Sequence, residues 1–245
     1  MIAVYLADTF YRLDLLERIE LKTLDYRFLW RGIEKPDDRI VILGIDDEAL
    51  DKIKDPMVFW GPHFAKVIRK LAQAGTRAIG MDFVFSIPIT KSVDGEDYDK
   101  ILAMALREAD CVILAKTFRN DRKTNAYLVD DPILRLRFAA SPEYAGFVNL
   151  ANDPDNCVRR QTLLIQDIKS KGHLAFGLAI LAKYYDILGK KAVSVKGGSV
   201  IMGDKVIPIN RYGEMLINFA GPSGAFHHIS FYEAWKMADE EGSME

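Results

Sequence analysis

Residues 60–85 read WGPHFAKVIRKLAQAGTRAIGMDFVF, and this stretch decides the fold class. Its first part repeats apolar side chains at helical spacing from Phe64 to Leu71. Pro62 falls in the predicted first turn, and Gly75 follows the last turn. The second part, residues 77–85, is a short apolar run of the kind found in buried strands. The stretch therefore predicts a helix followed by a strand.

The same alternation continues on both sides of this stretch. RIVILGI (39–45) predicts an earlier strand that is buried on both faces. Residues 97–110 predict a second helix, and CVILAKTF (111–118) and AGFVNL (145–150) predict two more strands. Strands that alternate with helices indicate right-handed crossovers between parallel strands. We therefore expect an α/β fold with a mainly parallel central sheet and flanking helices.

The remaining chain is expected to add an antiparallel C-terminal strand region to the same single domain, residues 1–245. Its predicted parts are a polar loop from 119, a hairpin or sheet-edge return at 158–166, a helix at 173–189, a hairpin turning at Gly197-Gly198, and a helix at 229–241. Trp30, Trp60 and Trp235 stand at the ends of predicted elements, where we expect them to seal the core.

Composition narrows the classes of function. The 245 residues carry 33 basic and 35 acidic side chains, a net charge of −2, which does not favour a nucleic-acid partner. Short basic pairs such as Arg159-Arg160 are expected on solvated faces. Cys111 and Cys157 form no zinc-binding pattern, and no apolar run is long enough to span a membrane. Neither a metal nor a cofactor is predicted.

Polar side chains that follow the predicted strands form the candidate ligand-binding site. They are Asp46, Asp47, Asp82, Lys116 and Asn149. Because ligands of open parallel sheets bind beyond the carboxyl ends of the strands, these groups could hold a magnesium ion or a cationic ligand. A strand-end aspartate also commonly caps the next helix, and for Asp46 and Asp82 this structural role is the main alternative.

An enzyme is the alternative function. A magnesium-dependent phosphohydrolase could use Asp46, Asp47 and Asp82, yet the one-residue gap that a haloacid-dehalogenase-type nucleophile loop needs is missing from Asp46-Asp47-Glu48. Phosphate-binding loops and nucleophile elbows are absent from the sequence. The adjacent His227 and His228 would point to opposite faces of a strand. We predict no catalytic residue, and a structural assembly domain without ligand is a third possibility.

Several stretches, in this order, resemble the CHASE type 2 family, the cyclase- and histidine-kinase-associated sensory extracellular domains. They are LDYRFLWRG (24–32), PDDRIVILGIDDEAL (36–50), residues 60–86, LREADCVILA (106–115), AGFVNLANDPDNCVRRQTLL (145–164), HLAFGLAILA (173–182) and INFAGPSGAFHHISFYEA (217–234). Each reads as ordinary secondary structure, whereas their joint order is specific and covers almost the whole chain.

The resemblance implies a non-catalytic, extracytoplasmic sensor of a bacterial membrane receptor, on the periplasmic or extracellular face. It would relay an unknown small-molecule or protein stimulus to a cytoplasmic adenylate or guanylate cyclase, histidine kinase or Ser/Thr kinase. Residues 1–32 would lead in from one membrane span, and 229–245 would return toward the next. Because such output modules work as dimers, a homodimer is expected through the apolar face of helix 10–29, which includes Leu21, Leu24 and Phe28. The family's ligands are not settled, so no binding residue is carried over.

Overall fold

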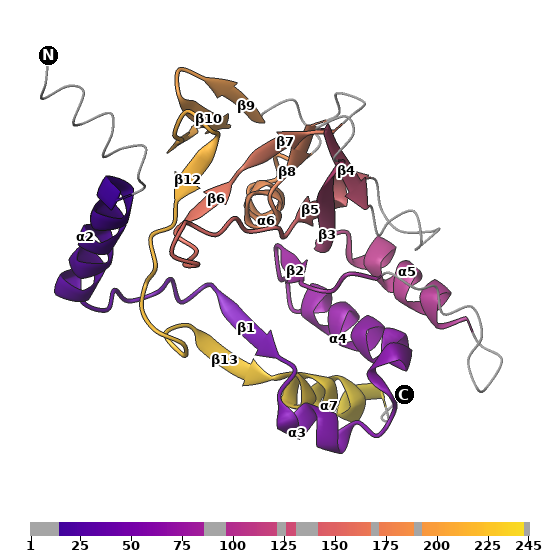
Figure 1. Ribbon diagram of the computed structural model, residues 1–245. Helices are drawn as coiled ribbons and strands as arrows, with labels where there is room; N and C mark the ends of the chain where they lie inside the picture. The colour runs from indigo at the N-terminus through magenta and orange to yellow at the C-terminus, as the bar shows by residue number, and fades with distance from the viewer. Residues whose placement is uncertain are drawn as a thin grey trace, which may run out of the picture. The chain divides into compact units, whose positions relative to one another are not determined.

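The computed structural model describes residues 15–85, 97–121, 126–130, 142–167, 172–188 and 193–242 (Figure 1). Contacts divide the chain into two compact units, which we describe separately. Unit 1 comprises Met1–Ile42, Leu150–Arg160 and Leu216–His228, and unit 2 comprises Leu43–Asn149, Gln161–Met215 and Ile229–Glu245. The predicted α/β class is confirmed, whereas the mainly parallel central sheet is not, since the strands of the described residues form several small sheets, some parallel and others antiparallel.

Unit 2 opens with the predicted alternation of helices and strands. In chain order its elements are α3 (Asp47–Lys52), the 3₁₀ turn η1 (Met57–Phe59), α4 (Gly61–Gln73), β2 (Ile79–Met81), α5 (Tyr98–Ala109), β3 (Val112–Asp121), β4 (Ala126–Asp130), η3 (Pro142–Tyr144) and β5 (Ala145–Phe147). Strand β3 pairs in parallel with both β2 and β5. Helices α4 and α5 lie side by side (Figure 1).

The polar stretch from residue 119 differs from its prediction. Strand β3 continues to Asp121, and its last five residues pair with β4 in an antiparallel register that sets Phe118 opposite Val129. Part of the expected loop is therefore a hairpin. Polar side chains are compatible with this because a hairpin satisfies its backbone groups by pairing and leaves the outer face to solvent.

Helix α4 shows how the decisive stretch works. Pro62 lies in its first turn, and its buried face contains Phe64, Val67 and Ile68. Gly75 follows at a φ of +83°, a left-handed conformation that glycine adopts without steric cost. Each of these features was predicted, because local periodicity and local backbone chemistry decide them.

The core of unit 2 forms two clusters of buried side chains. The first centres on Trp60, Phe64 and Phe231, where the ring of Phe231 stacks on that of Trp60 at 5.7 Å between centroids. The second gathers around Phe147. A Cβ atom on Gly146 would lie 2.5 Å from the Cα of Phe176, so only glycine allows β5 to approach the next helix this closely.

The rest of unit 2 is made mainly of short antiparallel pairs. Its remaining elements are β7 (Leu164–Gln166), β8 (Gly172–Leu174), α6 (Phe176–Tyr184), β9 (Val193–Lys196), β10 (Ser199–Met202) and β11 (Lys205–Pro208), followed at the C-terminal end by α7 (Phe231–Gly242). The hairpin at Gly197-Gly198 and helix α7 are confirmed. Residues 158–166 do not form a hairpin, and His173 lies on β8 instead of starting the helix.

Unit 1 contains the helix α2 (Leu15–Arg31), which ends before Gly32 at a φ of +79°. Leu21 is buried, and Leu24 and Phe28, one and two turns further along the same face, are half-buried. The predicted residues 10–14 of this helix lie outside the described part of the chain. Trp30 is 92% exposed, so it does not seal the core, whereas Trp60 is 1% exposed and does.

Four short strands contain residues of both units. They are β1 (Val41–Gly44), β6 (Arg160–Thr162), β12 (Glu214–Leu216) and β13 (His227–Ser230), and they pair as β1 with β13 and β6 with β12. The prediction that residues 39–45 are buried on both faces is wrong, since Val41 is 45% exposed and Ile42 is also exposed. Strand β1 pairs with β13 in a two-stranded sheet, and apolar composition alone cannot specify a partner.

Candidate functional site

Asp46 performs the structural task that was the alternative to ligand binding. Its carboxylate caps α3, with Oδ1 accepting the backbone N–H of Ala49 at 2.9 Å. The same oxygen accepts the hydroxyl of Ser230 at 2.9 Å, and the Ser230 hydroxyl in turn accepts the N–H of Tyr232 at the start of α7. The hydrogen bonds from Ala49 and, second, from Ser230 lower the pKa of Asp46. Asp47 is the exposed first residue of α3.

The other three predicted residues also occupy separate settings. Asp82 follows β2 and is exposed. Lys116 is 1% exposed on β3, with its Nζ 3.0 Å from Nδ1 of His173. Asn149 follows β5, and its side-chain amide accepts the N–H of Phe118 at 2.8 Å and donates to its carbonyl at 2.9 Å.

Three of the five side chains have structural surroundings, each of a different kind, whereas Asp47 and Asp82 are exposed. Asp46 forms hydrogen bonds at the starts of α3 and α7. Lys116 lies in the core against β8, and Asn149, which follows β5, is bonded to the neighbouring strand β3. Within the described ranges, no group of three or more His, Cys, Asp or Glu side chains is arranged to hold a metal ion. A ligand at Asp46, Asp47, Asp82, Lys116 and Asn149 stays a prediction.

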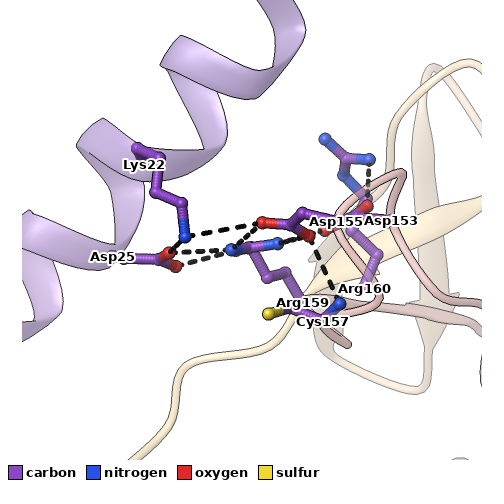
Figure 2. A network of polar contacts seen from close by, with 7 residues as sticks. All are labelled: Lys22, Asp25, Asp153, Asp155, Cys157, Arg159 and Arg160. Carbon is purple, nitrogen blue, oxygen red and sulfur yellow. Dashed lines mark hydrogen bonds and ion pairs between the residues drawn. The ribbon is translucent and has the colours of Figure 1, made fainter.

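Sequence reasoning missed the most extensive polar cluster of the described residues, which lies within unit 1 and is shown in Figure 2. We call it the Arg159 cluster. Its members are Lys22 and Asp25 on α2 and Asp153, Asp155, Arg159 and Arg160 on segment 150–160. Arg159 was expected on a solvated face, and that expectation is wrong because the residue is 4% exposed.

All five N–H groups of the Arg159 guanidinium donate to carboxylates. Nε and Nη2 bind the two oxygens of Asp25 at 2.8 and 2.7 Å. Nη1 and Nη2 bind the two oxygens of Asp155, both at 2.8 Å, and Nη1 also donates to Asp153 at 3.1 Å. Two of the three acids are thus held in the paired geometry that makes arginine–carboxylate contacts strong.

A tight turn presents two of these acids. The N–H of Asn156 donates to the carbonyl of Asp153 at 2.9 Å, and Asn156 adopts a φ of +61°. Asparagine tolerates this left-handed conformation better than most residues. The Asp155 carboxylate also accepts the N–H of Cys157, which fixes its direction. The sequence DPDN therefore builds a turn whose two aspartates face Arg159.

The charges of the Arg159 cluster balance. Three cations, Lys22, Arg159 and Arg160, lie against three carboxylates, those of Asp25, Asp153 and Asp155. The hydrogen bond from Arg159 is the main cause that lowers the pKa of Asp25 and of Asp155. The pKa of Arg159 is raised, first by Asp25 and then by Asp155. Each side of the cluster keeps the other side charged.

A second contact anchors the far end of α2. The guanidinium of Arg31 donates to the Asn218 side chain and to the Phe219 carbonyl, and it lies 4.8 Å above the ring of Phe28. The rings of Phe28 and Phe219 meet edge to face at 6.1 Å. The backbone N–H of Ile217 donates to the carbonyl of Arg159 at 2.9 Å. Segment 216–228 thus contacts α2 and also pairs with the arginine segment.

The same segment forms one wall of an open pocket of about 620 Å³ within unit 1. Its lining residues are Lys35, Pro36, Asp37, Asp38, Ile40 and Ser223, Gly224, Ala225, Phe226, His227 and His228. Asp37 is paired with Arg39, and Asp38 with Lys35 at 2.7 Å. The lining offers both charges, two imidazoles and apolar surface, which suits a small polar ligand better than a purely apolar one.

The comparison with protein-family models identifies the family of the chain. None of the curated proteins and none of the solved structures match the chain. In the described part of the chain, no helix is both long and apolar enough to cross a lipid bilayer. The family model described as the CHASE2 domain matches residues 1–242. The chain therefore belongs to the CHASE2 family of extracellular sensory domains, which is consistent with a sensor role.

Proposed function

We propose that the chain is the extracytoplasmic signal-input domain of a bacterial transmembrane receptor, which relays a stimulus to a cytoplasmic adenylate or guanylate cyclase or kinase module. The membership in a sensory family supports the first half of this proposal. For the relay we propose a role of the Arg159 cluster, which ties α2 to the segment that carries the DPDN turn.

The cluster is suited to a signalling contact because it is specific and reversible. Asp25 is 134 residues away from Arg159 in sequence, so the ion pair holds a helix to a distant segment. Ion pairs respond to pH and to competing ligands, and buried pairs such as these are screened by salt less than exposed ones, whereas an apolar contact depends mainly on its buried area. A stimulus that binds the paired and unpaired states with different affinity shifts the population of α2 between them.

The pocket of unit 1 is our preferred place for the stimulus. Its wall 223–228 continues directly from Asn218 and Phe219, which hold Arg31 of α2. A ligand that moves this wall therefore acts on the segment that anchors the helix. Ligand contacts at the strand-end residues Asp46, Asp47, Asp82, Lys116 and Asn149, which lie in separate settings, stay a second proposal.

The proposal includes membrane anchoring through flanking spans and a homodimer. The dimer face needs revision, because Leu21 is buried and Phe28 contacts Phe219 within the same unit. A second copy would meet the other side of α2, where Ile19, Tyr26 and Trp30 are exposed. Sedimentation of the chain at high concentration tests this: a monomer that persists counts against the dimer.

The direct test uses the full-length gene product in membranes. Spans on both sides of the chain and a cyclase or kinase beyond them are expected, and their absence would overturn the proposal. In that protein, Arg159→Ala should change basal output, measured as cyclic-nucleotide formation or phosphoryl transfer, several-fold. Lys196→Ala, an exposed residue of β9 in unit 2, is the matched control and should leave output unchanged. Equal output from both variants would remove the Arg159 cluster from the relay.

A further inference from the structure

The side chain of His63 joins helix α4 to helix α7 within unit 2. The indole Nε1 of Trp235, on α7, donates to Nδ1 of His63 at 2.9 Å. The other ring nitrogen, Nε2, lies 2.8 Å from a carboxylate oxygen of Asp55. The histidine side chain is 19% exposed, so protons from the solvent can reach it.

The two partners decide the protonation of this ring. An indole N–H can only donate, so Nδ1 of His63 must offer a lone pair. The carboxylate of Asp55 can only accept while it is ionised, so Nε2 carries the hydrogen. The arrangement in the structure therefore requires a neutral imidazole with its proton on Nε2.

A second proton on His63 is incompatible with the bond to Trp235. It would sit on Nδ1 and face the indole N–H, so that two donors would oppose each other over 2.9 Å. The bond to Asp55 would remain and become an ion pair. Protonation of His63 therefore keeps its contact with Asp55 and breaks its hydrogen bond with Trp235 on α7.

The other side chains around the contact between His63 and Trp235 belong to α4 and α7. Lys66 on α4 lies 5.6 Å above the Trp235 ring and pairs with Asp239 of α7. The Tyr232 ring stacks on that of Trp235 at 5.8 Å. None of these groups replaces the hydrogen bond that Trp235 loses.

We propose that His63 is a proton-operated latch on α7, which holds the helix through Trp235 when the imidazole is neutral and loosens it in acid. The sign follows from proton counting. The latched state binds one proton fewer than the released state, so the latch is favoured at high pH and weakened as pH falls. The inference deepens the proposed function by naming protons as a stimulus, and the part on signalling rests on that function.

The test follows the indole N–H of Trp235 by NMR on the 245-residue chain between pH 8 and pH 5, with the resonance assigned through Trp235→Phe. Its protection from solvent exchange, corrected for the intrinsic effect of pH, should fall about fivefold in acid. A change of about fivefold in an equilibrium corresponds to the net contribution of one hydrogen bond. In His63→Gln the side chain can still accept the indole N–H but does not titrate, so the change should vanish.

Two further variants sharpen the result. Asp55→Asn removes the carboxylate that favours the imidazolium and should move the midpoint to lower pH. Asp51→Asn, an exposed acid on α3 that pairs with Lys54, is the matched control and should not move it. If His63→Gln proves unstable, Trp235→Phe keeps the ring and lacks the N–H, so exchange of α7 backbone amides in that variant should lose the same pH dependence.

The latch is overturned if the wild-type Trp235 signal does not change between pH 8 and pH 5, or if the change persists in His63→Gln. These measurements need no output module, so a negative result removes the latch and leaves the sensor proposal intact. A full-length protein without membrane spans would overturn the sensor proposal and leave the latch intact.

Discussion

Helix α2 is held mainly by charged contacts, whereas the start of helix α7 is held by buried aromatic ones. Within unit 1, α2 is held by the charges of the Arg159 cluster, together with Arg31 and a few half-buried apolar side chains. Within unit 2, α7 begins with Phe231, which is buried against Trp60 and Phe64. Charged contacts depend on pH and salt, whereas buried aromatic area responds mainly to temperature and packing. A sensor that uses α2 as its mobile helix would need α2 to be held by charged contacts, which a stimulus can change, and not by buried aromatic area.

The largest loss of stability is expected in the aromatic core that holds the start of α7. Phe64→Ala removes a ring that packs at 5.0 Å from Phe83 and 5.4 Å from Phe231. Loss of a buried phenylalanine costs about 3–5 kcal/mol of the free energy of unfolding. Urea titration measures the loss, and hydrogen exchange should rise more in α7 than in α2. Leu50→Ala, at an exposed position of α3, is the control and should cost little.

Arg159→Ala should be the next most damaging change. It leaves the carboxylates of Asp25, Asp153 and Asp155 without their shared cation, a loss of about 2–3 kcal/mol after allowance for the partial exposure of Asp25. Hydrogen exchange should now rise more in α2 than in α7. Arg159→Lys should rescue only part of the loss, because an ammonium cannot bind two carboxylates in paired geometry. Full rescue by lysine would contradict the geometric argument.

Acid should act on the same contacts. The pKa values of Asp25 and Asp155 are lowered, chiefly by hydrogen bonds from Arg159. A lowered carboxyl pKa contributes stability that is present above the ordinary value of about 3.9 and is lost as pH falls below it. Amide protection of α2 should therefore decline below about pH 4, and the decline should be shallower in Asp25→Asn. A decline of equal size in that variant would show that other acids cause it.

The smallest effects concern Asp46 and Asp47. Asp46→Ala removes the cap of α3 and should cost about 1 kcal/mol, measured by thermal unfolding. Asp47→Ala alters an exposed first-turn residue and should cost a few tenths of a kcal/mol. If a ligand is found whose affinity falls more with Asp47→Ala than with Asp46→Ala, the structural reading of this pair is incomplete.

Much of the fold could be predicted where short-range chemistry decides it. The limits of α4 follow from Pro62, the apolar spacing and Gly75, and the hairpin at Gly197-Gly198 follows from two residues at positive φ. Pairing could not be predicted in the same way. The run RIVILGI has the composition of an inner strand, yet it pairs with β13, nearly 190 residues later in the chain.

The candidate site was harder to predict than the fold. Strand-end positions correctly drew attention to Asp46, but a capping aspartate and a ligand-binding one look alike in sequence. The Arg159 cluster was missed because Asp25 lies 134 residues before its partner. The available signal was the order of charges in DPDNCVRR, where two acids in a tight turn are followed by two arginines, and this order could have suggested internal pairing.

By itself, the sequence determined the class of the fold, the course of the main helices and tight turns, and the resemblance that the family match confirmed. These depend on periodicity, on backbone preferences and on the order of motifs, all of which are written along the chain. The tertiary structure decided which charges are buried, which strands pair and which side of α2 is covered. Such features depend on contacts between distant segments, and a linear pattern does not state which segments will meet.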